Sequence, residues 1–398
     1  MTATQARPVA PPKLGYRPAL DGLRAVSVLA VLLYHGEVHL FGGGFLGVEV
    51  FFVVSGFLIT SLMVEERILT RRIDLRQFWV RRARRLLPAL YLLLAVVSVG
   101  ALVVWRDASG RLGGDVLAAL AYVSNWWQIH LNDSYFVAAG RPPLLKHLWS
   151  LAVEEQFYLL FPPLFALAWV RLGRRRTRWV LLAGALASAV EMAVLFTPGK
   201  DTSRVYYGTD TRAAGLLLGA VLAVSWAPWR SRGQASRAAV ATMDAAGLVG
   251  LGIVLLFMTR VNAFDPFVYR GGFFLLDLVC LVVIAVVVHP ATRVARLLAW
   301  RPLVWVGVRS YSLYLWHWPI FQVTRPDIDL PLRGLPLLVL RLGLTVLAAE
   351  LSYTYVEQPL RKGAVGDWWR TLRGGGPAER ALAARRGLAV LSTAAVLT

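Results

Sequence analysis

Long apolar segments recur along the whole chain, and they constrain its fold more than any other feature. Each run is about 17 residues or longer, which is enough to cross the hydrocarbon core of a membrane as an α-helix. With 57% hydrophobic and 17% charged residues, the composition fits one helical bundle better than several soluble domains. The sequence therefore predicts an all-α, polytopic integral membrane protein.

We expect about ten transmembrane helices in one domain at 19–362. Residues 1–18 are rich in proline and should form a disordered cytoplasmic segment, and 363–386 should form a basic cytoplasmic linker. The apolar stretch at 387–398 is too short to cross a membrane, so it either lies at the interface or, as we favour, begins an eleventh span. The expected spans lie near residues 19–36, 45–64, 86–106, 148–170, 179–197, 205–226, 242–259, 272–289, 303–324 and 334–356.

The arginine-rich connections all follow even-numbered spans, which predicts the orientation of the bundle. Eight arginines lie between Arg67 and Arg85, and five more lie in 171–178. Basic residues concentrate on the cytoplasmic side of membrane proteins, so the N-terminus should be cytoplasmic. The formal net charge of +20 is then a topology signal, and nucleic acid is not an expected partner.

Several function classes are excluded by missing motifs. The single cysteine, Cys280, rules out an intramolecular disulfide framework and cysteine-rich zinc sites, and no metal site is expected. The chain also lacks a Walker-type loop, a dinucleotide-binding glycine motif after a strand, an H-E-x-x-H motif and a nucleophile elbow. These absences argue against an ATPase, a dinucleotide enzyme, a zinc protease and a lipase.

Two ionisable residues lie in the first expected span, where a charge usually faces a protein interior and marks a site. Arg24 and His35 are 11 positions apart, which places them on one helix face about 16.5 Å apart. Glu49 follows a short glycine-rich turn, so it could orient His35 as a general base. We expect His35 to be catalytic, with Glu49 as one orienting candidate. For Arg24 or His35 alone, snorkelling or helix capping explains the residue equally well.

The fourth span begins HLWSLAVEEQFYLLFPPL at 147–164 and carries two consecutive carboxylates. Glu154 and Glu155 project about 100° apart, so they cannot both face one partner. Glu154 could orient His35, and Arg212 is a candidate both to neutralise a glutamate and to stabilise an oxyanion. A structural ion pair between helices is the alternative for the two glutamates.

The arginines before the third span form a candidate phosphate site on the cytoplasmic side. Arg81, Arg82 and Arg85 directly precede the apolar run, and Arg24 enters the membrane from the same side. Arginine binds phosphate oxygens through paired hydrogen bonds, so these residues could hold the polyphosphate end of a large ligand. The flexible arm of that ligand would point toward His35. Positive-inside topology alone is the alternative.

Two further polar residues are assigned mainly to packing. Ser55 precedes Gly56 in the second span, and small residues there favour close helix contacts. Packing is the preferred interpretation for Ser55, which is also kept as a candidate donor-binding residue. His317 lies among aromatic residues in the ninth span, which favours a hydrogen-bonded histidine in an aromatic cluster.

These motifs together resemble the membrane-bound acyltransferase 3 family. The resemblance runs in consistent order over about 16–362 and includes Arg24 and His35 with ten residues between them. It continues through FFVVSGFLIT, the basic stretch ending RRLLP, HLWSLAVEEQFYLLFP, YYGTDTRAAGLLLGA, SYSLYLWHWPIF and VEQPLR.

The resemblance implies a ten-helix enzyme of the bacterial inner membrane. It would take an acyl group, commonly acetyl, from cytoplasmic acyl-coenzyme A to a hydroxyl of an extracytoplasmic glycan or lipid-linked sugar. His35 would be catalytic, Arg24 would belong to the same motif, and Glu154 or Glu155 would match the family glutamate. Its partners would be these two substrates and membrane lipids, with no permanently bound cofactor. Many members carry a C-terminal SGNH-type domain after an eleventh span, which 387–398 would begin.

Two questions stay open at the level of the sequence. A transporter or flippase for a lipid-linked or anionic solute is the main alternative, because intramembrane charges fit that class too. Against it, no pair of glycine- or proline-interrupted spans forms an inverted repeat. His35 could deprotonate the acceptor directly or carry the acyl group covalently.

Overall fold

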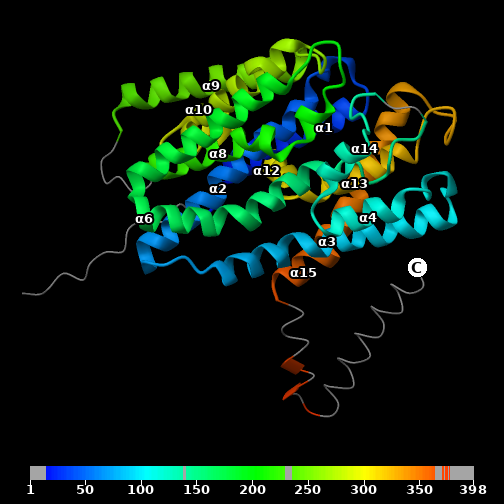
Figure 1. The fold of residues 1–398 in the computed structure, drawn as a ribbon, viewed down its shortest axis with the longest axis horizontal. Coiled ribbons are helices and arrows are strands. Elements are labelled where there is room, and N and C mark those ends of the chain that lie inside the picture. The colour runs from blue at the N-terminus through cyan, green and yellow to red at the C-terminus, as the bar shows by residue number, and fades with distance from the viewer. Residues whose placement is uncertain are drawn as a thin grey trace, which may run out of the picture.

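A computed structural model describes residues 15–137, 140–228, 235–363, 370–371, 373–374 and 376 (Figure 1). Over these residues the chain forms helices and no strand, which confirms the expected all-α bundle. Most of the expected disordered segment at 1–18 and of the linker at 363–386 lies outside the described residues. The expected start of an eleventh span at 387–398 lies outside them entirely.

Seven helices in the described part of the chain are long and apolar enough to cross a membrane. They run roughly side by side in the bundle (Figure 1). The seven are α1 (Pro18–His35), α2 (Gly47–Thr70), α3 (Leu75–Val103), α6 (Leu148–Leu195), α9 (Arg237–Arg260), α10 (Phe273–Val287, after the π-helical turn Val268–Gly272) and α14 (Gly334–Leu351, continued by the π-helical turn Ser352–Glu357 and α15, Gln358–Arg361).

The other expected spans also fall on helices, but with different shapes. The fourth and fifth spans form the single element α6, which is interrupted at Gly173, where φ is 72°. Glycine adopts this backbone conformation at little cost because it has no Cβ. The sixth span is α8 (Thr209–Ser225), and the ninth is divided at Arg309 into α12 (Arg301–Val308) and α13 (Ser310–Gln322).

The connections at one end of the bundle, which we call the His35 end, contain most of the short elements. They are 36–46, 104–147, 196–208, 261–267 and 323–333. Hydrogen bonds join several of them, as from Tyr135 to Ser203 and from Arg141 to Asp329. The elements here are η1 (His39–Phe41), η2 (Gly44–Leu46), η3 (Arg106–Ala108), α4 (Leu112–Leu120), α5 (Ser124–His130) and α7 (Ser203–Tyr207), and α11 (Arg293–Leu298) lies at the opposite end. Within 104–147, residues 115–131 fall mostly on two short helices, α4 and α5.

Helices α2 and α8 approach each other through glycines. A Cβ on Gly56 would lie 1.9 Å from the backbone oxygen of Leu216, and one on Gly219 would lie 2.2 Å from that of Val53. No side chain fits at such distances, so the two backbones are in direct contact. The packing role expected for Gly56 matches this geometry, and the contact fixes the position of the neighbouring Ser55.

We predict that Gly56→Ala destabilises the bundle. The added methyl group meets backbone atoms rather than a flexible side chain, and overpacking of this kind typically costs about 1–3 kcal/mol. Thermal unfolding of the purified protein in detergent should show a Tm several degrees below that of the wild type. Gly252→Ala in α9 is the matched control, because nothing lies within 4 Å of its Cβ. Equal Tm values for the two variants would contradict the close contact of α2 and α8.

Candidate active site

His35, the last residue of α1, lies between a second histidine and a tyrosine. Its Nδ1 is 2.9 Å from Nε2 of His317, and its Nε2 is 3.0 Å from the hydroxyl of Tyr135. The Trp318 ring meets the imidazole edge-on, with 4.8 Å between ring centroids. His317 is fully buried. Both nitrogens of His35 are therefore occupied by side chains that come from other parts of the chain.

The backbone carbonyl of Tyr314 decides which nitrogen of each ring carries a hydrogen. His317 Nδ1 lies 2.6 Å from this oxygen, which can only accept, so Nδ1 must be the donor. With both rings neutral, His317 Nε2 then accepts, and His35 Nδ1 donates to it. The lone pair of His35 Nε2 is left to accept the hydrogen of Tyr135. His35 is thus oriented as a candidate base, and its accepting nitrogen, Nε2, faces Tyr135 in the 132–137 segment.

Proline inside α13 ties this helix to the start of α6. Pro319 has no N–H, so the carbonyl of Leu315, four residues earlier, lacks its helical donor. His147, just before α6, takes that place, and its Nε2 donates to the Leu315 oxygen at 3.0 Å. The ring of His147 also packs edge-on against His317, with 5.8 Å between centroids. The polar contact therefore fixes α13 where it supports the histidine pair.

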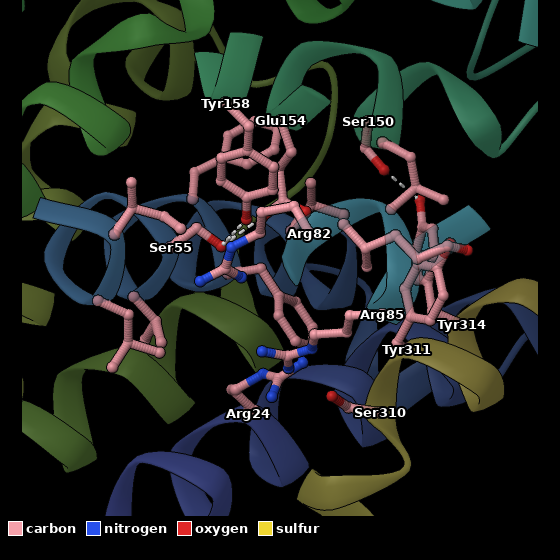
Figure 2. A pocket seen from close by; sticks show the side chains of 18 residues that line it. Arg24, Ser55, Arg82, Arg85, Ser150, Glu154, Tyr158, Ser310, Tyr311 and Tyr314 are labelled. Atoms are coloured by element: carbon pink, nitrogen blue, oxygen red, sulfur yellow. Dashed lines mark hydrogen bonds between the residues drawn. The ribbon is translucent and has the colours of Figure 1, made fainter. Parts of the chain in front are cut away.

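An open pocket of about 730 Å³ lies between α1, α2, α3, α6 and α13. Figure 2 shows the guanidinium groups of Arg24, Arg82 and Arg85 gathered near its centre. The pocket is also lined by Ser55 and Glu154. Arg24 also pairs with Asp21 at 3.5 Å. Three arginines against these two carboxylates still give the pocket a surplus of positive charge, which suits a phosphate-bearing ligand.

Hydrogen bonds connect the polar side chains on one wall of this pocket. Ser55 donates to Glu154 at 2.5 Å, and Tyr158 donates to Ser55 at 3.0 Å. The guanidinium of Arg82 lies over the Tyr158 ring, 5.4 Å from its centroid. Glu154 therefore has a polar partner, whereas Glu155 does not line the pocket. The roughly perpendicular projection of the two glutamates, expected from their spacing, places only one at this site.

Tyr314 belongs to both the pocket and the histidine pair. Its side chain lines the pocket beside Ser150, with 2.7 Å between the two hydroxyl oxygens, and its hydroxyl donates to the His147 carbonyl at 2.9 Å (Figure 2). Its backbone oxygen holds His317, as described above. One residue of α13 thus separates the arginine-lined pocket from the ring that orients His35.

The segment that carries Tyr135 is held over His35 by charged and polar groups. Lys146, which is almost fully buried, donates to the Ser134 carbonyl and pairs with Asp133 at 3.5 Å. Burial lowers the pKa of Lys146, although Asp133 beside it acts in the opposite direction. The backbone N–H of Tyr135 donates to Ser203 at 2.8 Å. These contacts keep the tyrosine hydroxyl against His35.

Three expected site residues lie elsewhere. Glu49 pairs with Arg212 at 2.6 Å, both fully buried, and not with His35. We therefore revise the expected pairing of Glu49 with His35, and Arg212 does not pair with either consecutive glutamate. Arg81 is half exposed and faces Glu66 at 4.0 Å, outside the pocket. The candidate donor site accordingly consists of Arg24, Arg82, Arg85 and Ser55.

Two residues at the centre of the site were not selected from the sequence. The aromatic residues around His317 favour a packing role in the sequence, although its motif SYSLYLWHWPIF is one of the segments that carry the family resemblance. Tyr135 lies in the long connection at 107–147, where no periodic pattern singles it out. The first could have been found by asking which intramembrane histidine could serve as partner to His35, because a second imidazole in a span needs a polar contact.

A helix bundle that places an oriented base beside an arginine-lined pocket is suited to a membrane-embedded group-transfer enzyme. Residues 17–354 match the model of the acyltransferase domain family. The chain therefore belongs to this family, which confirms the resemblance seen in its motifs. No solved structure matches the chain.

Curated relatives agree with this assignment. The chain is 41% identical over 357 residues to the peptidoglycan O-acetyltransferase OatA of Listeria monocytogenes, which covers 89% of this chain and 57% of that protein. It is 42% identical over 351 residues to the putative peptidoglycan O-acetyltransferase YrhL of Bacillus subtilis (87% and 55%), and 42% identical over 347 residues to the O-acetyltransferase OatA of Staphylococcus aureus (87% and 57%). The chain thus spans a little over half the length of these relatives.

We predict that His317→Ala lowers the rate of acyl transfer roughly 100-fold, the lower end of what a positioned general base contributes. We expect kcat to fall and KM for the acyl donor to stay unchanged. His317 contacts His35 and does not line the arginine-lined pocket. Added imidazole should restore part of the rate. His289→Ala, in the connection after α10, is the control. A rate that stays at the wild-type level would show that the histidine pair does not orient the base.

Proposed function

We propose that the chain is a membrane-bound O-acyltransferase that moves an acetyl group from cytoplasmic acetyl-coenzyme A to a hydroxyl of peptidoglycan on the other side of the membrane. The acceptor and the acetyl group are suggested by the names of the relatives. A bacterial inner membrane with a cytoplasmic N-terminus is part of the proposal. The arginine-rich connections support this orientation, because basic residues concentrate on the cytoplasmic side of membrane proteins.

The arginine-lined pocket is the proposed donor site. Coenzyme A carries phosphate groups at one end and the thioester at the end of a long flexible arm. Arg24, Arg82 and Arg85 supply the donors that phosphate oxygens need. The arm would extend along the pocket toward Tyr314, whose backbone oxygen holds His317. The single observation that carries the proposal is that one residue, Tyr314, lines the arginine-lined pocket and also holds the ring that orients His35.

His35 would act as the general base in the transfer step. The acceptor oxygen attacks the thioester carbonyl carbon, its proton passes to His35 Nε2, and the carbon–sulfur bond breaks to release coenzyme A, whose sulfur finally takes the proton. The alternative in which His35 carries the acyl group uses the same nitrogen. Trapping an acylated protein before acceptor is added would identify that covalent route.

We predict that His35→Ala abolishes peptidoglycan-linked acetyl esters formed by this protein. Ester-linked acyl groups on purified cell-wall glycans of an expressing strain would be measured by mass spectrometry at equal membrane levels of wild type and variant. Loss in the variant would show acyl transfer and identify both the acyl group and the sugar. Equal acetylation in both strains would remove His35 from the chemistry and overturn the proposal.

We also predict that Arg85→Gln weakens binding of coenzyme A about 10-fold or more, because a hydrogen bond to a charged group contributes roughly 1.5–3 kcal/mol. Binding would be measured calorimetrically on the protein in lipid nanodiscs. Arg84→Gln is the matched control, since Arg84 is the adjacent arginine, is exposed and does not line the pocket. A similar loss in both variants would indicate a general effect of charge rather than a phosphate contact in the pocket.

A further inference from the structure

We infer that the surface at the His35 end, directly over Tyr135, is a binding groove for a short stretch of uncharged, N-acetylated glycan. This inference rests on the proposed function and specifies where its acceptor binds. The groove consists of two neighbouring pockets of about 430 and 700 Å³, and Asp201 lines both of them. We call them the polar pocket and the aromatic pocket.

The two pockets offer the two kinds of contact that a sugar needs. The polar pocket, the smaller one, presents amide, carboxylate, hydroxyl and guanidinium groups, which can bond to hydroxyl and acetamido groups. Its polar lining is Gln128, Asn132, Asp133, Asp201, Ser203 and Arg204. The aromatic pocket is lined by Phe136, Phe196 and Phe264, whose rings suit the C–H faces of a sugar ring. Because the polar and the aromatic pocket adjoin at Asp201, they suit neighbouring units of one glycan.

The charges in the groove suit an uncharged glycan and not a phosphate-bearing donor. Two acidic residues, Asp133 and Asp201, are matched by two basic ones, Lys200 and Arg204. Arg204 is already paired with Asp210 at 2.6 Å. The groove therefore has no surplus of positive charge for phosphates, in contrast to the arginine-lined pocket.

The position of Tyr135 connects the groove with the catalytic histidine. Its neighbours line the groove: Asp133 lines the polar pocket, and Ser134 and Phe136 line the aromatic pocket. Tyr135 itself lines neither pocket and points inward to His35 Nε2. Ser203, which lines the polar pocket, accepts the hydrogen bond from the Tyr135 backbone. A sugar hydroxyl entering from the groove would replace the tyrosine hydroxyl at the one nitrogen of His35 that accepts.

Binding of a defined glycan tests the inference separately from catalysis. The full chain in nanodiscs would be dialysed against labelled tetra-N-acetylchitotetraose, and coenzyme A binding would be measured on the same preparations. The double variant N132G/F264A removes one polar contact and one aromatic wall. Asn132 already has a positive φ of 51° and Phe264 is exposed, so both changes should leave the fold intact. The matched control is D327G/I328A, which alters a positive-φ residue and an exposed apolar residue outside the groove.

We expect N132G/F264A to bind the tetrasaccharide at least 10-fold more weakly than the wild type, with unchanged affinity for coenzyme A, and the control to bind both normally. Equal glycan binding by N132G/F264A and the wild type would overturn the inference that this groove binds glycan. The absence of glycan binding by the wild type would overturn it as well. The proposed function fails on different observations: no coenzyme A binding, or cell-wall acetyl esters that do not depend on His35. The two failures can therefore be told apart.

Discussion

The hydrogen bond from His317 to the backbone oxygen of Tyr314 is the interaction on which the rest of the site depends. Because a carbonyl can only accept, the hydrogen of His317 must be on Nδ1. His317 Nε2 therefore accepts, and His35 Nδ1 must donate to it. A carboxylate would orient His35 as well, but it would add a charge at membrane depth. A neutral ring held by the backbone gives the same tautomer without that cost.

Helix α13 can perform this function because its regular hydrogen bonding is interrupted. Arg309 separates it from α12, and Pro319 leaves the Leu315 carbonyl for His147. The helix carries Tyr314 to the wall of the pocket and His317 to His35 one turn later. A long, continuous span would place these groups just as close, but would leave no carbonyl to bind the start of α6.

The sequence was most informative where a physical rule acts on a long stretch of chain. Apolar runs predicted the helical bundle, and the arginines expected at a phosphate site meet in one pocket, apart from Arg81. The expected spans do not correspond one to one with the helices, because α6 joins two of them and α12 and α13 divide one. Nothing near His35 in the sequence points to its partners, since His317 lies 282 positions away and Tyr135 lies 100 positions away. Only His317 could be found, as a second histidine in a span, whereas no pattern selects Tyr135. Proximity in the sequence suggested Glu49 instead.

The ion pair of Glu49 with Arg212 shows how this fold distributes its buried charges. Glu49, Arg212 and Asp277 lie together, and Arg212 is covered by the Phe273 ring at 4.0 Å. A buried arginine with acidic neighbours is largely compensated, so it serves packing between α2, α8 and α10. In the arginine-lined pocket, Glu154 and Asp21, the ion-pair partner of Arg24, leave a surplus of positive charge among three arginines. Because such a surplus at membrane depth is costly, its retention there points to an anionic ligand, whereas Arg212 faces two carboxylates and needs none.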